Sequence, residues 1–170
     1  PEFFWTGETD MKCVADTVGG LNEYAYEHHI QRLMVTGLYA MLVGADPRAV
    51  EDWYMGMFVD SVEWVTLPNV VGMSQYADGG IMASKPYAAT GKYIQRMSNY
   101  CTTCRFNPAA ATGDIACPFT TLYWDFLDRH ESRLKRNRRM ALQVKNLERK
   151  TPEEREAIRR EARRYKDGLS

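Results

Sequence analysis

Apolar side chains recur every three to four positions along most of the chain, which is the spacing of one face of an α-helix. A first long helix is predicted over residues 21–43, ending at Gly44, and a second from Asp46-Pro47 to about residue 65. Asp46 supplies an N-cap and Pro47 a favourable first-turn residue. Further helices are predicted over residues 88–100, from Pro118 to about residue 136, and from a cap at Thr151 to Gly168. No alternating strand pattern occurs, so the sequence predicts an all-α fold.

Residues 69–86 depart from this helical pattern. Gly72, Gly79, Gly80 and Pro86 interrupt any long element there, although aromatic residues and methionines persist. A long non-polar loop inside a compact domain is more often functional than a simple connection. We therefore expect this segment to carry function.

The composition indicates one well-packed domain without a membrane segment. The chain has 170 residues, of which 45% are apolar and 12% aromatic, enough for a sizeable core. No apolar run approaches the roughly 20 residues of a membrane span, and the first residues do not resemble a signal peptide. Four cysteines without an export signal point to reduced thiols. We expect a cytoplasmic monomer with no membrane association.

The formal net charge of +0 hides a strong asymmetry. Residues 129–166 contain 15 basic and 6 acidic side chains, a ratio typical of a segment that contacts a polyanion. A solvated, salt-bridged helix is the alternative, and we favour it for the last stretch. The better candidates for phosphate contact have few acidic neighbours in the sequence: Arg133, Lys135, Arg136, Arg138 and Arg139.

The four cysteines form the most specific pattern for metal binding. Cys101, Cys104 and Cys117 follow the spacing Cys-x2-Cys-x12-Cys, and Cys13 lies far upstream. Iron–sulfur clusters take four thiolates, and a tetrahedral zinc site accepts the same set. Because zinc motifs usually pair their ligands two and two, the one-plus-three layout favours a cluster. Zinc and no metal remain alternatives.

His28 and His29 form a second candidate site. Adjacent helical residues point about 100° apart, so the two imidazoles could line one cavity from two angles. Arg32 lies one turn further on, and Asp60, in the otherwise apolar second helix, needs a partner such as Arg32. Histidine is the usual proton donor near neutral pH. The alternative is that one histidine is an ordinary helix residue and the Arg32–Asp60 pair is structural.

The motifs of several common enzyme classes do not occur in the sequence, and no other catalytic motif replaces them. No nucleophile elbow, P-loop, Rossmann glycine pattern or His-Glu-x-x-His site is present. Large aromatic residues are abundant; most belong in a core, although the same residue types build electron-hopping chains. Without further comparison, the residues indicate a helical iron–sulfur or zinc domain with a His/Arg/Asp cavity and a possible nucleic-acid partner.

Four longer strings are more specific than these motifs: EHHIQRLM at 27–34, LPNV at 67–70, GMSQYADGG at 72–80 and ASKPY at 83–87. With the four cysteines, they resemble the bacterial iron–sulfur branch of the cryptochrome/photolyase family, which includes the prokaryotic (6-4) photolyases. The resemblance covers roughly residues 5–133. It implies that residues 1–136 are the C-terminal portion of the helical FAD-binding domain and that residues 137–170 are basic C-terminal helices. It also implies that the N-terminal α/β antenna domain is absent.

The resemblance implies two cofactors. Cys13, Cys101, Cys104 and Cys117 match the ligands of a [4Fe–4S] cluster. Arg32 and Asp60 match the pair that flanks the isoalloxazine ring of FAD, and Thr66 falls where the family places the side chain facing flavin N5. We expect a Glu at that position in this branch. Thr66 is therefore a departure, and it puts in question how the protein stabilises a flavin radical or protonates reduced flavin.

Other residues match an electron route and a lesion pocket. Trp53, with Tyr54 and Trp5, matches the route that replaces the usual tryptophan triad. The matches to the lesion pocket are His28, His29, Met73, Tyr87 and Tyr93. Lys85, Arg105 and the basic stretch near Arg133 are expected to hold the DNA backbone.

The implied activity is light-driven repair of (6-4) pyrimidine dimers in UV-damaged DNA, with electron transfer from reduced FAD to a flipped-out lesion. His29 is the first choice for proton donor, supported by His28. Two alternatives stay open. One is a cryptochrome-type blue-light photoreceptor with the same cofactors; the other is a light-independent Fe–S nucleic-acid-binding module similar to the C-terminal domain of the large primase subunit.

Overall fold

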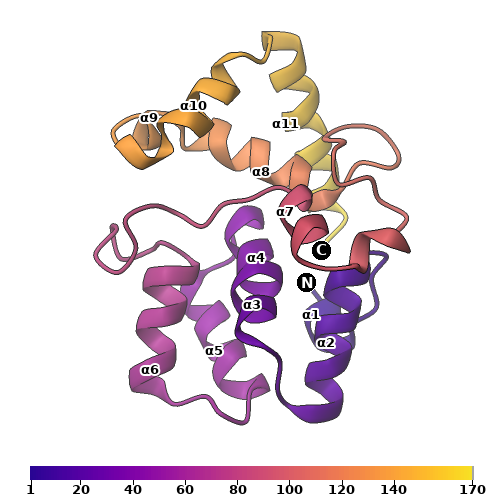
Figure 1. Ribbon diagram of the computed structural model, residues 1–170, viewed down its shortest axis with the longest axis vertical. Coiled ribbons are helices and arrows are strands. Elements are labelled where there is room, and N and C mark those ends of the chain that lie inside the picture. Colours follow the sequence, from indigo (N-terminus) through magenta and orange to yellow (C-terminus); the bar gives the residue numbers. More distant parts are fainter. Residues whose placement is uncertain (170) are drawn as a thin grey trace.

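The computed structural model describes residues 1–169, and it confirms the all-α prediction: these residues contain helices and no β-strand, with one isolated backbone bridge between Asn107 and Ala116. Figure 1 shows the arrangement. The α-helices are α1 Phe3–Thr6, α2 Lys12–Tyr24, α3 His29–Gln31, α4 Leu38–Val43, α5 Pro47–Met57, α6 Glu63–Leu67, α7 Gly91–Met97, α8 Pro118–Arg129, α9 Glu131–Leu134, α10 Ala141–Glu148 and α11 Pro152–Asp167. Two π-helical segments span Arg32–Gly37 and Pro68–Ser74, and 3-10 turns span Tyr100–Thr102 and Arg138–Met140.

The single helix predicted over residues 21–43 was wrong, because the chain breaks between α2 and α3. Ala25 ends α2 in the left-handed conformation, with φ 52°. Its carbonyl accepts a hydrogen bond from the backbone N–H of Val59, 2.9 Å away on the connection after α5. His28 is extended, with ψ 145°, and caps the new helix. A contact with a distant part of the chain therefore interrupts a helical sequence pattern.

The second predicted helix also ends early, at Met57 rather than near residue 65. Phe58 is extended, and the Ser61 hydroxyl donates to the Tyr54 carbonyl at 2.9 Å, in the last turn of α5. Side-chain hydroxyls near a helix end offer the backbone such an alternative to continued helix. As a result, Asp60 lies in the connection between α5 and α6, not inside a helix as the sequence suggested.

Helix ends marked by capping residues follow the sequence prediction more closely. Gly44 ends α4 with φ 89°, and the Asp46 carboxylate accepts from the Arg48 amide at 2.8 Å. The Thr151 hydroxyl and the Glu154 carboxylate form the predicted capping box at the start of α11. The helix predicted from Pro118 begins there, but it is divided into α8 and α9, and the helix predicted over residues 88–100 is limited to Gly91–Met97.

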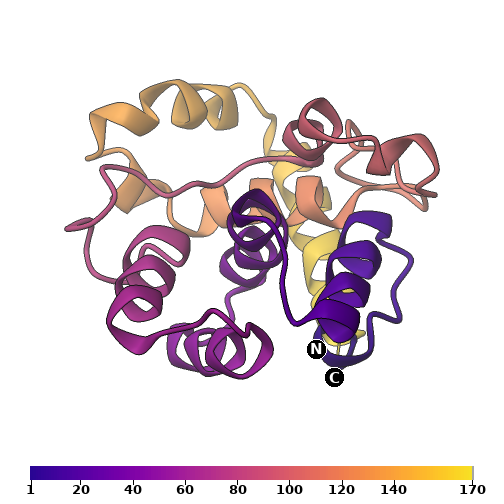
Figure 2. The ribbon, with the colours of Figure 1, turned by 60° about the horizontal axis from the view of Figure 1, so that its bottom comes forward.

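Helix α8 is the centre of the core, and α4, α7, α10 and α11 pack against it. Its residues Leu122 and Leu127 are fully buried. In Figures 1 and 2, α11 runs from α10 back towards α1 and α2. There the hydroxyl of Tyr165 lies 3.0 Å from that of Tyr39 and donates to the Met11 sulfur. The C-terminal helices thus share one core with the N-terminal half.

The basic side chains of the C-terminal region differ in whether they form ion pairs. Helix α11 is salt-bridged, as the sequence analysis favoured: Arg155 pairs with Asp128 and Glu131, and Lys166 pairs with Asp125. In contrast, three exposed arginines have no ion pair with the described residues 1–169: Arg136, Arg138 and Arg139. None of the described helices is both long enough and apolar enough to cross a bilayer.

His130, at the end of α8, predicts a pH dependence of stability. Its ring centroid lies 4.8 Å from that of Phe126, and burial, reinforced by Arg129 and Arg133, lowers its pKa from the usual 6.5. The unfolded chain then binds the proton more readily than the folded one, so stability is present above the ordinary pKa and is lost as the pH falls. We expect the Tm to decrease between about pH 6.5 and 5. His130→Gln should flatten this part of the curve in thermal unfolding; equal slopes in both proteins would contradict the assignment.

Candidate functional site

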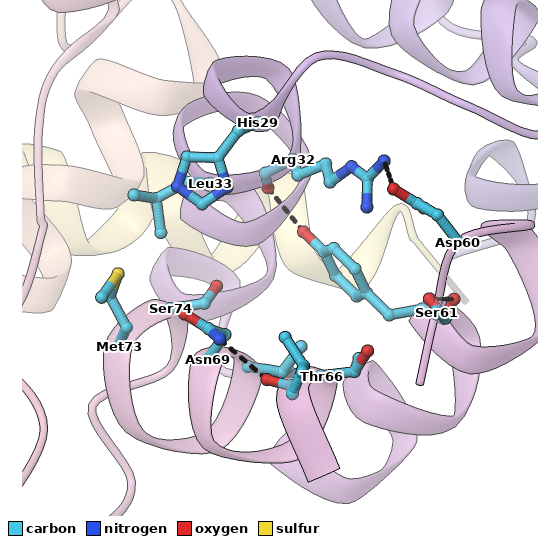
Figure 3. Close-up of a pocket in the computed structure, with 12 residues that line it drawn as sticks. His29, Arg32, Leu33, Asp60, Ser61, Thr66, Asn69, Met73 and Ser74 are labelled. Carbon is cyan, nitrogen blue, oxygen red and sulfur yellow. Dashed lines mark hydrogen bonds and ion pairs between the residues drawn. The ribbon is translucent and has the colours of Figure 1, made fainter. Parts of the chain in front are cut away.

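A cavity of about 200 Å³ lies between the first π-helical segment and the second, with α6 along one side. Figure 3 shows its lining residues, which come from α3 to the end of the second π segment. The lining residues are His29, Arg32, Leu33, Tyr54, Asp60, Ser61, Val65, Thr66, Asn69, Val70, Met73 and Ser74. The structure therefore brings His29, Arg32, Asp60, Thr66 and Met73 to one cavity. The sequence had grouped only the histidines, Arg32 and Asp60, and gave Thr66 and Met73 separate roles.

Arg32 and Asp60 form the charged wall of this cavity. An Arg32 guanidinium nitrogen lies 2.9 Å from a carboxylate oxygen of Asp60, and Arg32 Nε donates to the Glu27 carbonyl at 2.8 Å. The guanidinium also lies over the Phe58 ring, 4.2 Å from its centroid, a cation–π arrangement. The hydrogen bond from Arg32 holds the pKa of the Asp60 carboxyl below its usual value. A fixed, fully charged pair can bind the polar edge of a ring system.

The π-helical geometry opens the backbone at the base of the cavity. The Arg32 carbonyl accepts hydrogen bonds from the hydroxyls of Tyr54, at 2.5 Å, and Thr36, at 3.0 Å. Gly37 permits the close approach of the two π segments: a Cβ there would lie 2.9 Å from the Arg32 carbonyl oxygen and would collide with the Ser74 hydroxyl. π-helical turns recur at functional sites.

The sequence analysis missed four polar residues near this cavity. Gln75 is buried and donates to the Gly37 carbonyl at 3.0 Å and to the Ser74 hydroxyl at 2.9 Å. Asn69 and Ser61 line the cavity itself. The sequence contained Asn69, Ser74 and Gln75 only as members of the strings LPNV and GMSQYADGG, and it gave no signal for Ser61.

The two adjacent histidines line different cavities, which corrects the expectation that they share one. His29 lines the cavity of Arg32, whereas His28 lines a second cavity with Gln31, Tyr93 and Tyr100. The reason is the break before α3. His28 is the extended N-cap, and its Nδ1 accepts from the Ile30 amide at 3.2 Å instead of projecting from a helix face.

The residues predicted to carry an electron, Tyr54, Trp53 and Trp5, differ in how far they lie from solvent. Tyr54 lines the cavity, and the Trp53 ring packs edge-on against it with centroids 5.1 Å apart. Trp53 is buried and its Nε1 donates to the Phe4 carbonyl at 3.1 Å. Trp5 is 58% exposed and lines a third cavity together with Trp53. The order Tyr54, Trp53, Trp5 is thus one of increasing exposure.

Apart from the two histidines, the residues predicted to contact the lesion or the DNA next to it do not share one cavity. Met73 lines the cavity with His29, and in Figure 3 it lies on the same side as His29, away from Asp60. Tyr93 lines the second cavity, with His28. Lys85 and Tyr87 belong to the irregular segment after the second π segment and are not among the lining residues of either cavity.

The four cysteines line one small cavity of their own, next to Gly91 and Tyr100. All four are free thiols, from α2, the turn Tyr100–Thr102, the loop after it and the N-cap of α8. Burial, reinforced by the three other thiols, raises the pKa of Cys13. Burial raises the pKa of Cys117 to about 11. A Cβ on Gly91 would lie 2.7 Å from the Cys117 sulfur, so glycine leaves room for this thiol.

This cysteine site offers four thiol donors around one small cavity. Within residues 1–169, no group of three or more His, Cys, Asp or Glu side chains converges closely enough to hold one ion. The thiolates of an iron–sulfur cluster bind different irons, so their sulfurs stand farther apart than those around one tetrahedral zinc. Four cysteines around a common cavity fit that donor set. The [4Fe–4S] assignment itself stays a prediction.

Two curated proteins are similar to this chain. A (6-4) photolyase from Agrobacterium fabrum (strain C58 / ATCC 33970) is 57% identical over 141 residues, which cover 83% of this chain and 28% of that protein. An uncharacterized protein, R855, from Acanthamoeba polyphaga mimivirus is 31% identical over 108 residues, covering 64% of this chain and 80% of that protein. No family model matches the chain. The chain spans only 28% of the length of the photolyase that it matches.

Proposed function

Because this chain belongs to the photolyase-like family, we propose that it forms the C-terminal part of the catalytic domain of an enzyme that repairs (6-4) pyrimidine dimers in DNA. The observation that carries the proposal is the cavity that holds His29 together with the Arg32–Asp60 pair. One molecule bound in this cavity could contact both His29, as a proton donor, and the charged pair. The family-level assignment to photolyase-type repair rests on the 57% identity.

Six residues in or near the cavity have a role in the proposal. Reduced FAD, when bound, supplies the light-driven electron. Arg32 and Asp60 would help to hold the FAD, and Tyr54 with Trp53 offers a path for an electron towards the surface. His29 donates the proton to the lesion, since imidazole is the side chain suited to this near neutral pH. His28 supports it from the second cavity.

Thr66 changes the proton chemistry expected at the flavin. A threonine hydroxyl can form a hydrogen bond but, unlike a carboxyl group, it does not ionise near neutral pH and so cannot act as a proton donor or acceptor in catalysis there. Asn69, one turn further on, is also neutral, and its side-chain amide donates to the Val65 carbonyl at 2.7 Å. We infer that this side of the cavity offers hydrogen bonds only and that protons reach the site from the histidine side.

The cysteine site, in the same proposal, is a structural clamp. A [4Fe–4S] cluster on Cys13, Cys101, Cys104 and Cys117 would tie α2 to the segment that leads into α8. Binding of the cluster would stabilise the folded chain, because the site does not exist in the unfolded chain.

The proposed DNA partner is supported by an exposed basic surface. Arg136, Arg138 and Arg139 lie on the turn before α10, and Asn137 in that turn donates to the Ser84 carbonyl at 2.9 Å. This hydrogen bond joins the turn that carries the arginines to the segment that carries Lys85. Side chains of this kind contact phosphates and set the position of a protein on DNA without reading its sequence.

Replacing these three arginines together with Gln should weaken binding to damaged and undamaged DNA alike. The slope of log K against log salt should decrease by about 2.7, since each phosphate contact contributes about 0.9. The matched control is the same charge change on α11, with Arg160, Arg163 and Arg164 replaced by Gln. Titrations at several salt concentrations measure both. Equal decreases in the two triple variants would assign the effect to net charge and reject the surface.

Lesion recognition in the dark tests the proposed function. The natural full-length protein, titrated without light, should bind a duplex with one (6-4) dimer at least tenfold more tightly than the undamaged duplex. This is expected because a damaged base costs less to flip into a cavity. A cryptochrome-type photoreceptor has no need of this preference. Equal affinities for the two duplexes would favour the photoreceptor, or a light-independent nucleic-acid-binding module, over the repair enzyme.

A further inference from the structure

We propose that Gln31 and Tyr100 position the His28–His29 turn by tying it to the segment that carries Cys101. Neither residue is assigned a role in the chemistry. The link stands on hydrogen bonds of this chain, and only its consequence for repair rests on the proposed function.

Both ends of the Gln31 amide are engaged. Its oxygen accepts from the backbone N–H of His28 at 3.2 Å, which closes a capping box. Its nitrogen donates to the Tyr100 hydroxyl at 3.0 Å, across 69 positions of sequence. One side chain therefore fixes the first residue of the histidine turn and at the same time attaches it to a distant element.

The histidine turn needs such support. Helix α3 is the first turn of a helical stretch that continues through the first π-helical segment into α4, and the break at Ala25 separates this first turn from α2. The first turn of a helix frays readily because its N–H groups have no partner within the helix. His28, His29 and Ile30 are all exposed. Two hydrogen bonds within the turn fix its backbone: the Ile30 amide donates to His28 Nδ1, and the His28 amide donates to the Gln31 side chain. They set the direction in which the two imidazoles leave the backbone.

Tyr100 is the shared wall of two cavities. It lines the cavity of His28 and also the cavity of the four cysteines, and it immediately precedes Cys101 in the turn Tyr100–Thr102. Through its hydrogen bond to Gln31, Tyr100 therefore connects the cysteine segment to the histidine turn. The two residues act as positioning residues, because they hold His28 and His29 and do not themselves line the cavity of Arg32.

Amide hydrogen exchange tests the link in the dark and without DNA. The His28 and Ile30 amides should lose protection at least tenfold in Gln31→Met, which removes both hydrogen bonds, and in Tyr100→Phe, which removes the phenol alone. Gln31→Glu should retain protection, because a carboxylate accepts from both the His28 amide and the Tyr100 hydroxyl. Gln143→Met is the matched control; the side-chain oxygen of Gln143 has no hydrogen-bond partner within residues 1–169.

The double variant adds an internal check. If the two residues act through one link, Gln31→Met with Tyr100→Phe should expose the amides no more than Gln31→Met alone. Unchanged protection in Gln31→Met, or equal loss in Gln31→Glu, would overturn the proposal. In the full-length protein, Tyr100→Phe should lower the repair rate and leave the dark affinity for damaged DNA unchanged. If the wild-type protein repairs nothing, the proposed function fails while the exchange result still decides the link.

Discussion

Replacing Cys101 with Ala should remove the bound iron and lower the Tm by roughly 10 °C. Loss of a metal site commonly costs several kcal/mol, and in a chain of this size each kcal/mol corresponds to about 2–4 °C. Cys101 shares its cavity with the three other cysteines, so no other described thiol lies in position to replace it. Iron analysis, the visible absorption at about 400 nm expected for such a site, and thermal unfolding measure the effect.

Thr103→Ala is the matched control for this substitution. Thr103 is exposed and lies between Cys101 and Cys104, so the variant changes the same loop without removing a thiol. It should keep both iron and Tm. Stoichiometric zinc in the wild-type protein, or a Cys101→Ala variant with unchanged iron content, would contradict the cluster assignment and leave a helical nucleic-acid-binding domain as the better account.

Replacing His29 with Asn should lower the rate of light-driven repair by a factor of about 10² to 10⁴, the usual contribution of a general acid. His29 is the histidine that lines the cavity of Arg32 and Asp60. Dark affinity for the lesion should change little, because the loss concerns proton transfer and not binding. Turnover of a (6-4) oligonucleotide under light, with a dark titration, separates the two.

The neighbouring histidine provides the comparison. His28 lines the second cavity and caps α3, and asparagine is itself a good N-cap. His28→Asn should therefore keep the turn intact and lower the rate less than His29→Asn. A larger loss in His28→Asn would assign the proton donor to His28 instead.

Capping residues in the sequence predicted several helix ends, whereas the two unexpected breaks accompany hydrogen bonds that the apolar pattern does not contain. Asp46 and Thr151 cap their helices through hydrogen bonds within the next three residues, so the pattern was sufficient. The break at Ala25 accompanies a hydrogen bond from Val59 on the connection after α5, and the end after Met57 accompanies a hydrogen bond from Ser61 to Tyr54 that overrides the apolar periodicity. No periodicity in a single segment contains that information.

The candidate site was predicted in part. The Arg32–Asp60 pair was expected because a carboxylate among apolar residues needs a partner, and the structure contains it at 2.9 Å. The expected position of Asp60 inside a helix was wrong. The contact of Gly37 with Ser74 could not be predicted, because it joins two segments far apart in the sequence and no pattern marked either segment as π-helical. The resemblance to the photolyase family is confirmed by the 57% identity.

Light-dependent repair by the natural full-length protein tests the central claim most directly. A duplex with one (6-4) dimer is incubated with the reduced protein in blue light or in darkness, and the restored pyrimidines are counted by chromatography. We predict repair in light, none in darkness, and loss of repair in His29→Asn. A protein that carries both flavin and iron, binds the lesion and still repairs nothing in light would contradict the account.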